Sequence, residues 1–345
     1  MPNRRSFIKT SAASAAALGS SRLLIAQQSE PKNAVIGEGS FKYECLHYWG
    51  ALPEGHNYGG ATHGVALDSE GLVYITHQGG PGSIFVFDPQ GKFVRSLAPE
   101  HQGEGHGIDV RREGSQDFLY LSPNSFQKPH ACEKMTTKGE VVWQKGPPPE
   151  SHKYDDGKGF NSTNISFSPD GGFHVGDGYG RHFIHRYDKE ANYVSSFGGA
   201  GSGPGQFKTP HGHWLDVRDG IPKICVCDRA NDRLQFVSLD GQHLSFLPGF
   251  AFPASAETKG DLLLIAELKG GIALLDKSNK VVARLGDDPE WRAQINSNRI
   301  SRSTRDKWLP GRFVHPHDAA FDKEGNIYVA EWVAGGRVTK MRKVS

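Results

Sequence analysis

The sequence predicts an all-β protein that forms a single six-bladed β-propeller. One pattern recurs along the chain: a small residue or proline, often with histidine, then an apolar run, aspartate, a glycine turn and further strand-like runs. A unit of four short strands every ~40–50 residues is typical of a propeller blade. Glycine supplies 43 of the 345 residues, against a usual ~7%, which indicates many tight turns. No stretch keeps a 3.6-residue apolar period, which excludes a helical solenoid.

Each blade is expected to begin where an apolar run follows a small residue, proline or histidine. Blades one, two, three, four and six begin at His63, His106, Asn164, His211 and His317. Blade five matches the pattern poorly, and we expect a degenerate blade that contains residues 262–266 and 272–276. The runs are short and rich in β-branched and aromatic residues, as strands are.

The last blade is expected to include a strand from the N-terminal part of the chain. Blade six stops after its third strand, at residues 337–341, and residues 41–50 form a strand without a blade of their own. We therefore expect this N-terminal strand to complete blade six, which would remove the open sheet edges. Residues 147–160 are expected as a polar loop, and residues 287–311 as an insertion with a short helix around 291–295.

The first residues have the features of an export signal. Arg4 and Arg5 precede Phe7 and Ile8, and a short stretch rich in alanine and serine follows. This order is typical of a twin-arginine signal, and the stretch is too short to span a membrane. We expect a twin-arginine export signal over 1–28, a linker over 29–40 and the propeller over 41–345. The protein is then expected in the periplasm or outside the cell, without a membrane span.

Composition limits the classes of partner. The chain carries 40 basic and 38 acidic residues, so nothing in its charge favours nucleic acid as a partner. A small-molecule or peptide substrate is expected, with a protein partner on one propeller face as a further expectation. The cysteines form no CxxC pair, so we expect them to be structural or free. They are Cys45, Cys132, Cys225 and Cys227.

The spacing of three histidines predicts a metal site. His106 and His211 lie 105 residues apart, and His211 and His317 lie 106 residues apart, which is two blades in each case. In a six-bladed ring, blades two, four and six lie ~120° apart, so their inner strands would bring the three imidazoles to one point on the axis. Three histidines with an open fourth position are typical of catalytic zinc. Imidazole also suits other transition metals, so zinc is the first expectation among several.

Further side chains are candidates for the surroundings of this site. His63 begins blade one and is a candidate fourth ligand, or a group that contacts a ligand or the substrate. His213 follows His211 by two residues, and His77 ends the second strand of blade one. The structural alternative is that each histidine at a blade start only packs the inner turn.

The sequence resembles the NHL-repeat propellers, and among them the peptidyl-α-hydroxyglycine α-amidating lyases, over roughly residues 45–343. The runs that carry the resemblance are 210–212, 225–233, 177–179 and 316–318. That family is a zinc lyase that splits a C-terminal α-hydroxyglycine into a peptide amide and glyoxylate. The resemblance implies zinc on His106, His211 and His317.

Other site residues of the family can be matched to single positions of this sequence. Tyr179 matches its catalytic tyrosine and Arg229 matches an active-site arginine. Asp318 matches an acid associated with a structural calcium. The chain departs from the family at Gln78, where the family has a second active-site arginine, and this departure weakens the expected grip on a substrate carboxylate. Gly180 and Phe236 stand where the family has disulfide cysteines.

Two alternatives to a lyase stay open at the level of sequence. One is a non-catalytic NHL propeller that binds a protein or another ligand across one face. The other is a calcium-dependent lactonase-type hydrolase. The lactonase is less favoured because calcium prefers oxygen ligands, whereas the predicted axial positions offer imidazole.

Overall fold

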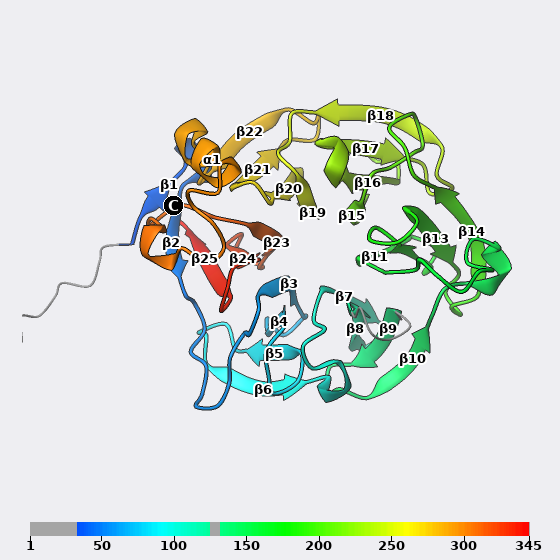
Figure 1. The fold of residues 1–345 in the computed structure, drawn as a ribbon, viewed down its shortest axis with the longest axis horizontal. Coiled ribbons are helices and arrows are strands. Elements are labelled where there is room, and N and C mark those ends of the chain that lie inside the picture. The colour runs from blue at the N-terminus through cyan, green and yellow to red at the C-terminus, as the bar shows by residue number, and fades with distance from the viewer. Residues whose placement is uncertain (1–32, 125–131, 345) are drawn as a thin grey trace, which may run out of the picture. The chain divides into compact units, whose positions relative to one another are not determined.

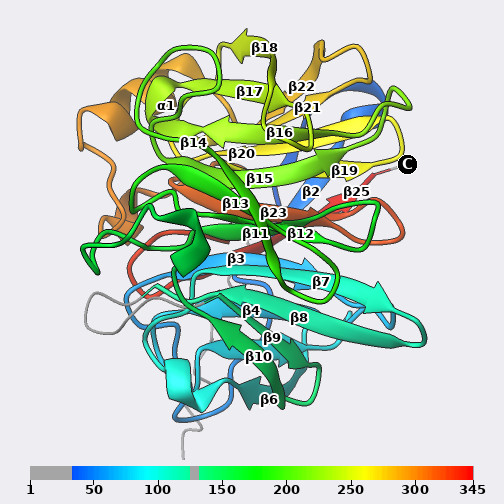
Figure 2. The same ribbon diagram turned by 90° about the vertical axis from the view of Figure 1, so that its right-hand side faces the viewer.

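Six antiparallel sheets lie around a common axis in a computed structural model that describes residues 33–124 and 132–344 (Figures 1 and 2). Each sheet is one blade, and its strands follow one another from the axis outward. The six-bladed propeller predicted from the repeats is therefore confirmed. The expected export signal over 1–28 lies outside the described residues.

Blades one to five each have four strands, which run in sequence order between the axis and the rim. Blade one has β3 (Thr62–Leu67), β4 (Val73–His77), β5 (Ile84–Phe87) and β6 (Phe93–Leu97). Blade two has β7 (Gly107–Glu113), β8 (Gln116–Ser122), β9 (Cys132–Thr136) and β10 (Val141–Lys145). Blade three has β11 (Asn164–Phe167), β12 (Phe173–Gly176), β13 (Phe183–Tyr187) and β14 (Tyr193–Gly198). Blade four has β15 (Pro210–Asp216), β16 (Lys223–Asp228), β17 (Arg233–Val237) and β18 (His243–Pro248). Blade five has β19 (Pro253–Lys259), β20 (Leu262–Glu267), β21 (Gly271–Leu275) and β22 (Val281–Leu285). Blade five is thus regular in structure although its sequence pattern is weak.

Blade six closes the ring with strands from both ends of the chain. Its inner strands are β23 (Pro316–Phe321), β24 (Ile327–Glu331) and β25 (Arg337–Lys343). The outer strand is β2 (Tyr43–His47), which pairs antiparallel with β25. A two-residue strand, β1 (Val35–Ile36), pairs with β2 and lies inside the segment expected as a linker. The predicted closure by the N-terminal strand is confirmed.

The recurring aspartate and glycine of the repeat build the turns between strands. In blade one, the Asp68 carboxylate accepts hydrogen bonds from the backbone N–H groups of Glu70 and Leu72. Gly71 follows with φ +87°, a left-handed conformation that glycine adopts without a steric penalty. Asp322 forms the same kind of turn in blade six, where it accepts from Asn326 N–H. The repeat is therefore readable in sequence because its turn chemistry is repeated.

The apolar core lies between the blades rather than at one centre. Six clusters of buried side chains are each shared by two neighbouring blades, so every blade packs against both of its neighbours. Between blades one and six, for example, Phe85 and Phe87 pack with Tyr328 and Ala330. The four cysteines lie in this buried interior and are free, as expected. This arrangement leaves the axis itself available for polar side chains.

The helices lie in the connections. The one α-helix among the described residues is α1 (Pro289–Asn296), in the insertion where a short helix was expected. Its N-terminus is capped by Asp288, which accepts from Glu290 and Trp291 N–H. The 3₁₀ turns are η1 (Gly39–Phe41), η2 (Pro99–His101), η3 (Pro149–Ser151), η4 (Arg229–Asn231) and η5 (Arg305–Lys307). Within residues 33–124 and 132–344, none of the helices has the length and apolar character needed to cross a membrane.

Candidate functional site

Four histidines from the starts of inner strands meet at the axis, and we call them the histidine cluster: His63, His106, His211 and His317. Their ring centroids lie 4.6–5.1 Å apart in five of the pairs. His63, His211 and His317 each lie where the pairing of the inner strand with the second strand shifts register. Such bulges re-aim side chains. The structure thus brings the three histidines of the predicted site together and adds His63 to them.

Three histidines of the cluster are oriented in the same way. The Nδ1 atoms of His106, His211 and His317 lie 3.0, 2.7 and 3.1 Å from backbone carbonyls of the next blade. Those carbonyls belong to Thr163, Ala254 and His63 respectively, which occupy the equivalent positions at the blade starts. Because a carbonyl only accepts, each Nδ1 donates, and each Nε2 keeps its lone pair for another partner. A hydrogen bond of this kind orients metal-ligating histidines in proteins.

Glycine follows His63, His106 and His211 and allows the inner strands of neighbouring blades to approach each other closely. A Cβ atom on Gly107 would lie 2.3 Å from the Thr163 carbonyl oxygen, and one on Gly212 would lie 2.5 Å from that of Ala254. A Cβ on Gly64 would lie 2.7 Å from the carbonyl oxygen of His106. Any larger residue would push the inner strands apart. The His-Gly pairs in the sequence therefore have a structural reason that also serves the orientation of the imidazoles.

The donor set fits a transition metal ion. Among the described residues, both ring nitrogens of His63 and Nε2 of His317 are buried without a hydrogen-bond partner. One candidate ligand atom from each of His63, His106 and His317 lies within 4.8 Å of the other two. Burial holds the pKa of His106, His211 and His317 well below the usual range, and that of His63 at about 3. The imidazoles are therefore neutral, as metal binding requires.

Tyr179 and Arg229 lie against the cluster. The Tyr179 hydroxyl is 3.0 Å from Nε2 of His211 and 3.2 Å from Nε2 of His106, and it accepts a hydrogen bond of 3.3 Å from Nη1 of Arg229. The single phenolic proton can be donated to only one of the two imidazoles at a time. Arg229 is 8% exposed, and its guanidinium lies 5.1 Å from the Tyr179 ring centroid. The two residues that the family resemblance assigned to catalysis are thus in mutual contact.

The loop that carries Tyr179 is held by Asp177. The buried Asp177 carboxylate accepts from the N–H groups of Asn161 and Arg181 and from the Tyr154 hydroxyl. Burial nevertheless raises the pKa of Asp177 to about 6. A Cβ on Gly180 would lie 1.9 Å from Asp177 Oδ1, so this position needs glycine. Gly180 therefore has a local role in the loop, at the position where the family has a cysteine.

The other predicted neighbours lie at different distances from the cluster. Gln78 follows β4, and its amide is near enough to His63 to favour that imidazole's protonated form, although no hydrogen bond joins them. His77 points into blade one, where its ring stacks 3.7 Å from that of Phe85. His213 is buried beside blade three with Nδ1 2.7 Å from Ser166 Oγ. His77 and His213 therefore pack between strands and do not join the histidine cluster.

A second set of polar groups lies deeper along the axis, and we call it the carboxylate layer: Asp109, Glu257 and Asp318. The pocket that these three line adjoins the pocket of the histidine cluster, and Asp318 borders both. Burial raises the pKa of Asp318 to about 7, and burial and mutual repulsion raise the pKa of Asp109 and of Glu257 well above the usual range. Oxygen donors of this kind suit calcium.

The sequence argument found Asp318 and missed the other two. Asp109 follows the blade-start histidine His106 by three residues, and Glu257 follows the equivalent Ala254 by three residues. This shared offset is the signal that could have identified them. It was hidden because blade five lacks a histidine at its start.

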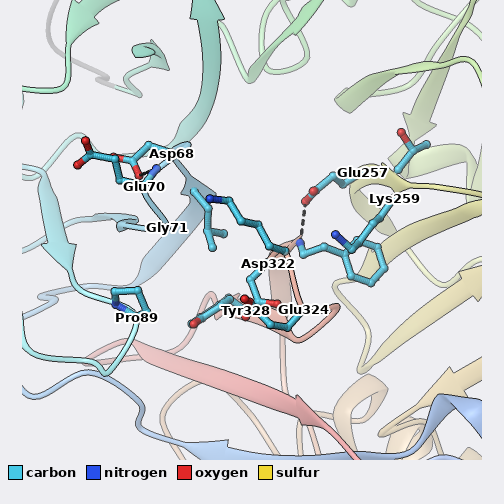
Figure 3. A pocket seen from close by; sticks show the side chains of 13 residues that line it. Asp68, Glu70, Gly71, Pro89, Glu257, Lys259, Asp322, Glu324 and Tyr328 are labelled. Carbon is cyan, nitrogen blue, oxygen red and sulfur yellow. Dashed lines mark hydrogen bonds between the residues drawn. The ribbon is translucent and has the colours of Figure 1, made fainter. Parts of the chain in front are cut away.

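The opposite end of the inner strands carries a different hollow (Figure 3). Acidic residues line it, and Asp68, Glu257 and Asp322 use carboxylate oxygens within the fold. Asp68 accepts two backbone N–H groups of its own turn, and Glu257 accepts from Phe321 N–H at 3.2 Å. We therefore place the candidate site at the histidine end of the axis.

Comparison with known proteins finds distant relatives. No protein-family model matches the chain. The peptidyl-glycine α-amidating monooxygenase of Mus musculus is 23% identical over 321 residues, and that of Rattus norvegicus is 24% identical over 322 residues. In each case the match covers 79% of this chain and 29% of the relative, so the chain spans less than a third of the length of these proteins. The chain is thus distantly related to amidating enzymes that are much longer than itself.

Solved structures share the fold. A catalytically inactive variant of virginiamycin B lyase from Staphylococcus aureus with quinupristin has a TM-score of 0.55 at 15% identity, over 88% of this chain and 100% of that chain. A protein of unknown function from Bacteroides thetaiotaomicron has a TM-score of 0.57 at 14% identity, over 89% and 78% of the two chains. Identities this low support the propeller fold alone.

Proposed function

We propose that this protein is a metal-dependent lyase that cleaves the C–N bond of an α-hydroxyglycine compound and releases glyoxylate. One observation carries the proposal: the Tyr179 hydroxyl lies between Nε2 atoms of two cluster histidines and is touched by a buried arginine. A phenol in this place is a general base beside a metal-binding group, and the distant relationship to amidating enzymes supports the same chemistry.

His106, His211 and His317 would hold the metal, most favourably zinc, because each donates through Nδ1 and so can ligate through the lone pair of Nε2. The Tyr179 hydroxyl contacts two of these Nε2 atoms. His63 is the alternative third ligand, since it forms a close group with His106 and His317. A bound zinc ion would supply Lewis acidity that lowers the pKa of a substrate hydroxyl. By the same resemblance, calcium would occupy the carboxylate layer at Asp318 in a structural role.

The chain's own groups move the proton. Tyr179, as the phenolate, takes the proton of the substrate's α-hydroxyl, and the Arg229 guanidinium stabilises the negative charge on the phenolate oxygen. The electrons of the O–H bond form the carbonyl of glyoxylate while the C–N bond breaks. The departing nitrogen receives a proton from Tyr179 and leaves as a primary amide. Atoms and charge balance without a further reactant.

The test uses α-hydroxyhippurate as substrate. Zinc-loaded protein is expected to release benzamide and glyoxylate in equal amounts, and a chelator is expected to stop the release. Protein with Tyr179→Phe should keep its zinc and lose turnover. Zinc-loaded wild-type protein that leaves α-hydroxyhippurate intact over hours would reject this substrate class and favour a non-catalytic binding propeller.

We also propose that residues 1–28 direct export through the twin-arginine pathway, with the mature protein in the periplasm or outside the cell. The support is the pair Arg4 and Arg5 ahead of Phe7 and Ile8. Replacing both arginines by lysine should leave the protein in the cytoplasmic fraction of a bacterial host that has this pathway. Unchanged export of the double variant would contradict the assignment.

A further inference from the structure

Two guanidinium groups flank the histidine cluster without an acidic partner. Among the described residues, neither Arg229 nor Arg302 takes part in an ion pair, and Nε of Arg229 is buried without any hydrogen bond. The charge of Arg229 is buried, whereas Arg302 is partly exposed. A buried charge without a partner is costly in a folded protein. Because no acidic side chain of the described residues pairs with either arginine, the site carries uncompensated positive charge. This charge points to an anionic ligand.

Arg302 reaches the site from outside the repeat. It follows α1 in the insertion between blades five and six, and its guanidinium lies 3.8 Å over the Trp332 ring. Its Nη2 donates to the backbone carbonyl of Gly60, just before β3. These contacts fix the side chain over the boundary between blades six and one. A guanidinium has five N–H donors, so most of them remain for a ligand.

The two arginines lie on opposite sides of the axis at the same end. Arg229 follows β16 of blade four, whereas Gly60 and Trp332, which hold Arg302, border blades one and six. Second strands end where first strands begin, so both arginines stand at the histidine end. Arg229 contacts the Tyr179 hydroxyl, which in turn contacts two histidines of the cluster. Arg302 donates to Gly60, which precedes His63 by three residues.

Gln78 lies beside Gly60, the residue whose carbonyl accepts from Arg302. A Cβ on Gly60 would lie 2.6 Å from Gln78 Oε1, so this amide packs against the residue that holds Arg302. The amide carries no charge. The cation on the blade-one side of the site is therefore Arg302, which the sequence motif could not reveal.

We propose that Arg302 makes this site specific for a ligand with a carboxylate group. Arg302 binds the carboxylate, either jointly with Arg229 or from the side of the site opposite Arg229. The identity of the ligand as an acylated glycine rests on the proposed function. A planar guanidinium presents parallel N–H groups that match both oxygens of a carboxylate. The sequence predicts weak binding of a substrate carboxylate, because Gln78 stands where the family has an arginine. Arg302 of the insertion would instead bind this carboxylate strongly.

The experiment measures binding of hippurate and of its neutral analogue hippuramide by calorimetry, to metal-free and zinc-loaded full-length protein. Wild-type protein should bind hippurate at least tenfold more tightly than hippuramide. Arg302→Gln should remove most of this difference by weakening hippurate alone, and Arg302→Lys should retain part of it. Arg299→Gln is the matched control, because Arg299 is an exposed arginine of the same insertion. Unfolding temperatures confirm that each variant is folded.

The outcomes separate this inference from the lyase proposal. Equal binding of the two compounds by wild-type protein, or an unchanged preference in Arg302→Gln, would overturn the role of Arg302 even if glyoxylate is released. A hippurate preference that depends on Arg302 in a protein that releases no glyoxylate would support the inference and reject the lyase.

Discussion

The glycines next to the cluster histidines give the sharpest prediction for a single residue. Gly107→Ala would place a methyl group 2.3 Å from the Thr163 carbonyl oxygen that holds His106. The strands must separate, so we expect a loss of stability of ~1–3 kcal/mol, as for other overpacked sites, together with weaker zinc binding. Gly146→Ala is the control, since nothing lies within 4 Å of its added methyl group. Denaturant unfolding and zinc titration measure both effects, and equal behaviour of the two variants would contradict the close approach.

Single alanine variants of the histidine cluster decide which three residues bind the metal. If His106, His211 and His317 bind the metal, His211→Ala should abolish stoichiometric zinc binding, because two imidazoles hold zinc poorly. His63→Ala should then weaken zinc binding much less. Metal analysis of dialysed protein without a polyhistidine tag provides the readout. The reverse order would assign the site to His63, His106 and His317 instead.

Tyr179 should matter for rate rather than for affinity. Tyr179→Phe removes one oxygen that contacts two imidazoles and one guanidinium. Loss of a general base typically lowers the rate by ~10²–10⁴-fold, whereas the binding surface barely changes. Steady-state kinetics should therefore show a fall in kcat with little change in KM. A variant that is impaired only in KM would make Tyr179 a binding residue.

At the scale of elements, the closing strand should be essential. Deleting residues 1–50 removes β2 and exposes the edge of β25, so we expect aggregation or a large fall in the unfolding temperature. Deleting residues 1–28 leaves β1 and β2 in place and should keep the unfolding temperature. Thermal unfolding followed by circular dichroism compares the two. A stable, monomeric 1–50 deletion would show that the pairing of β2 with β25 contributes little.

The repeat explains which elements were predictable. Blade starts, turns and the closing strand could be located because each reuses one chemistry: histidine or a small residue, an apolar run, then aspartate and glycine. The same repeat placed the three histidines of alternate blades, whereas Tyr179 and Arg229 were found through the family resemblance. Arg302 could not be located, since it lies in an insertion whose path depends on packing against Trp332. His77 was ambiguous because strand alternation alone does not tell the axis from the space between blades.

Over the whole molecule, buried neutral histidines should make stability depend on pH. Burial lowers the pKa of His185 to about 3 and those of His47 and His174 to about 4. In the unfolded chain histidine titrates near ~6.5. Below that pH these histidines bind more protons in the unfolded state than in the folded state, so their contribution to stability is complete above ~6.5 and falls as the pH drops toward 4.

Each such group contributes a slope of up to ~1.4 kcal/mol per pH unit in this window. Denaturant unfolding at pH 7, 6, 5 and 4 in the presence of a chelator measures the slope without a metal contribution. His185→Gln should reduce it, and His152→Gln, at an exposed position, should not. A slope that is equal in wild-type protein and in His185→Gln would contradict neutral burial of His185. The comparison is needed because buried acids with a raised pKa, such as Asp177 and Asp318, change the total slope in the opposite direction.

The pairing of β2 with β25 joins residues at the two ends of the chain, such as His47 and Thr339. During synthesis, β2 emerges 292 residues before its partner position in β25. Contacts this distant in sequence slow folding, and the ring can close only after β25 has been made. The N-terminal strand would spend that interval as an unpaired template, exposed to chaperones and to other nascent chains.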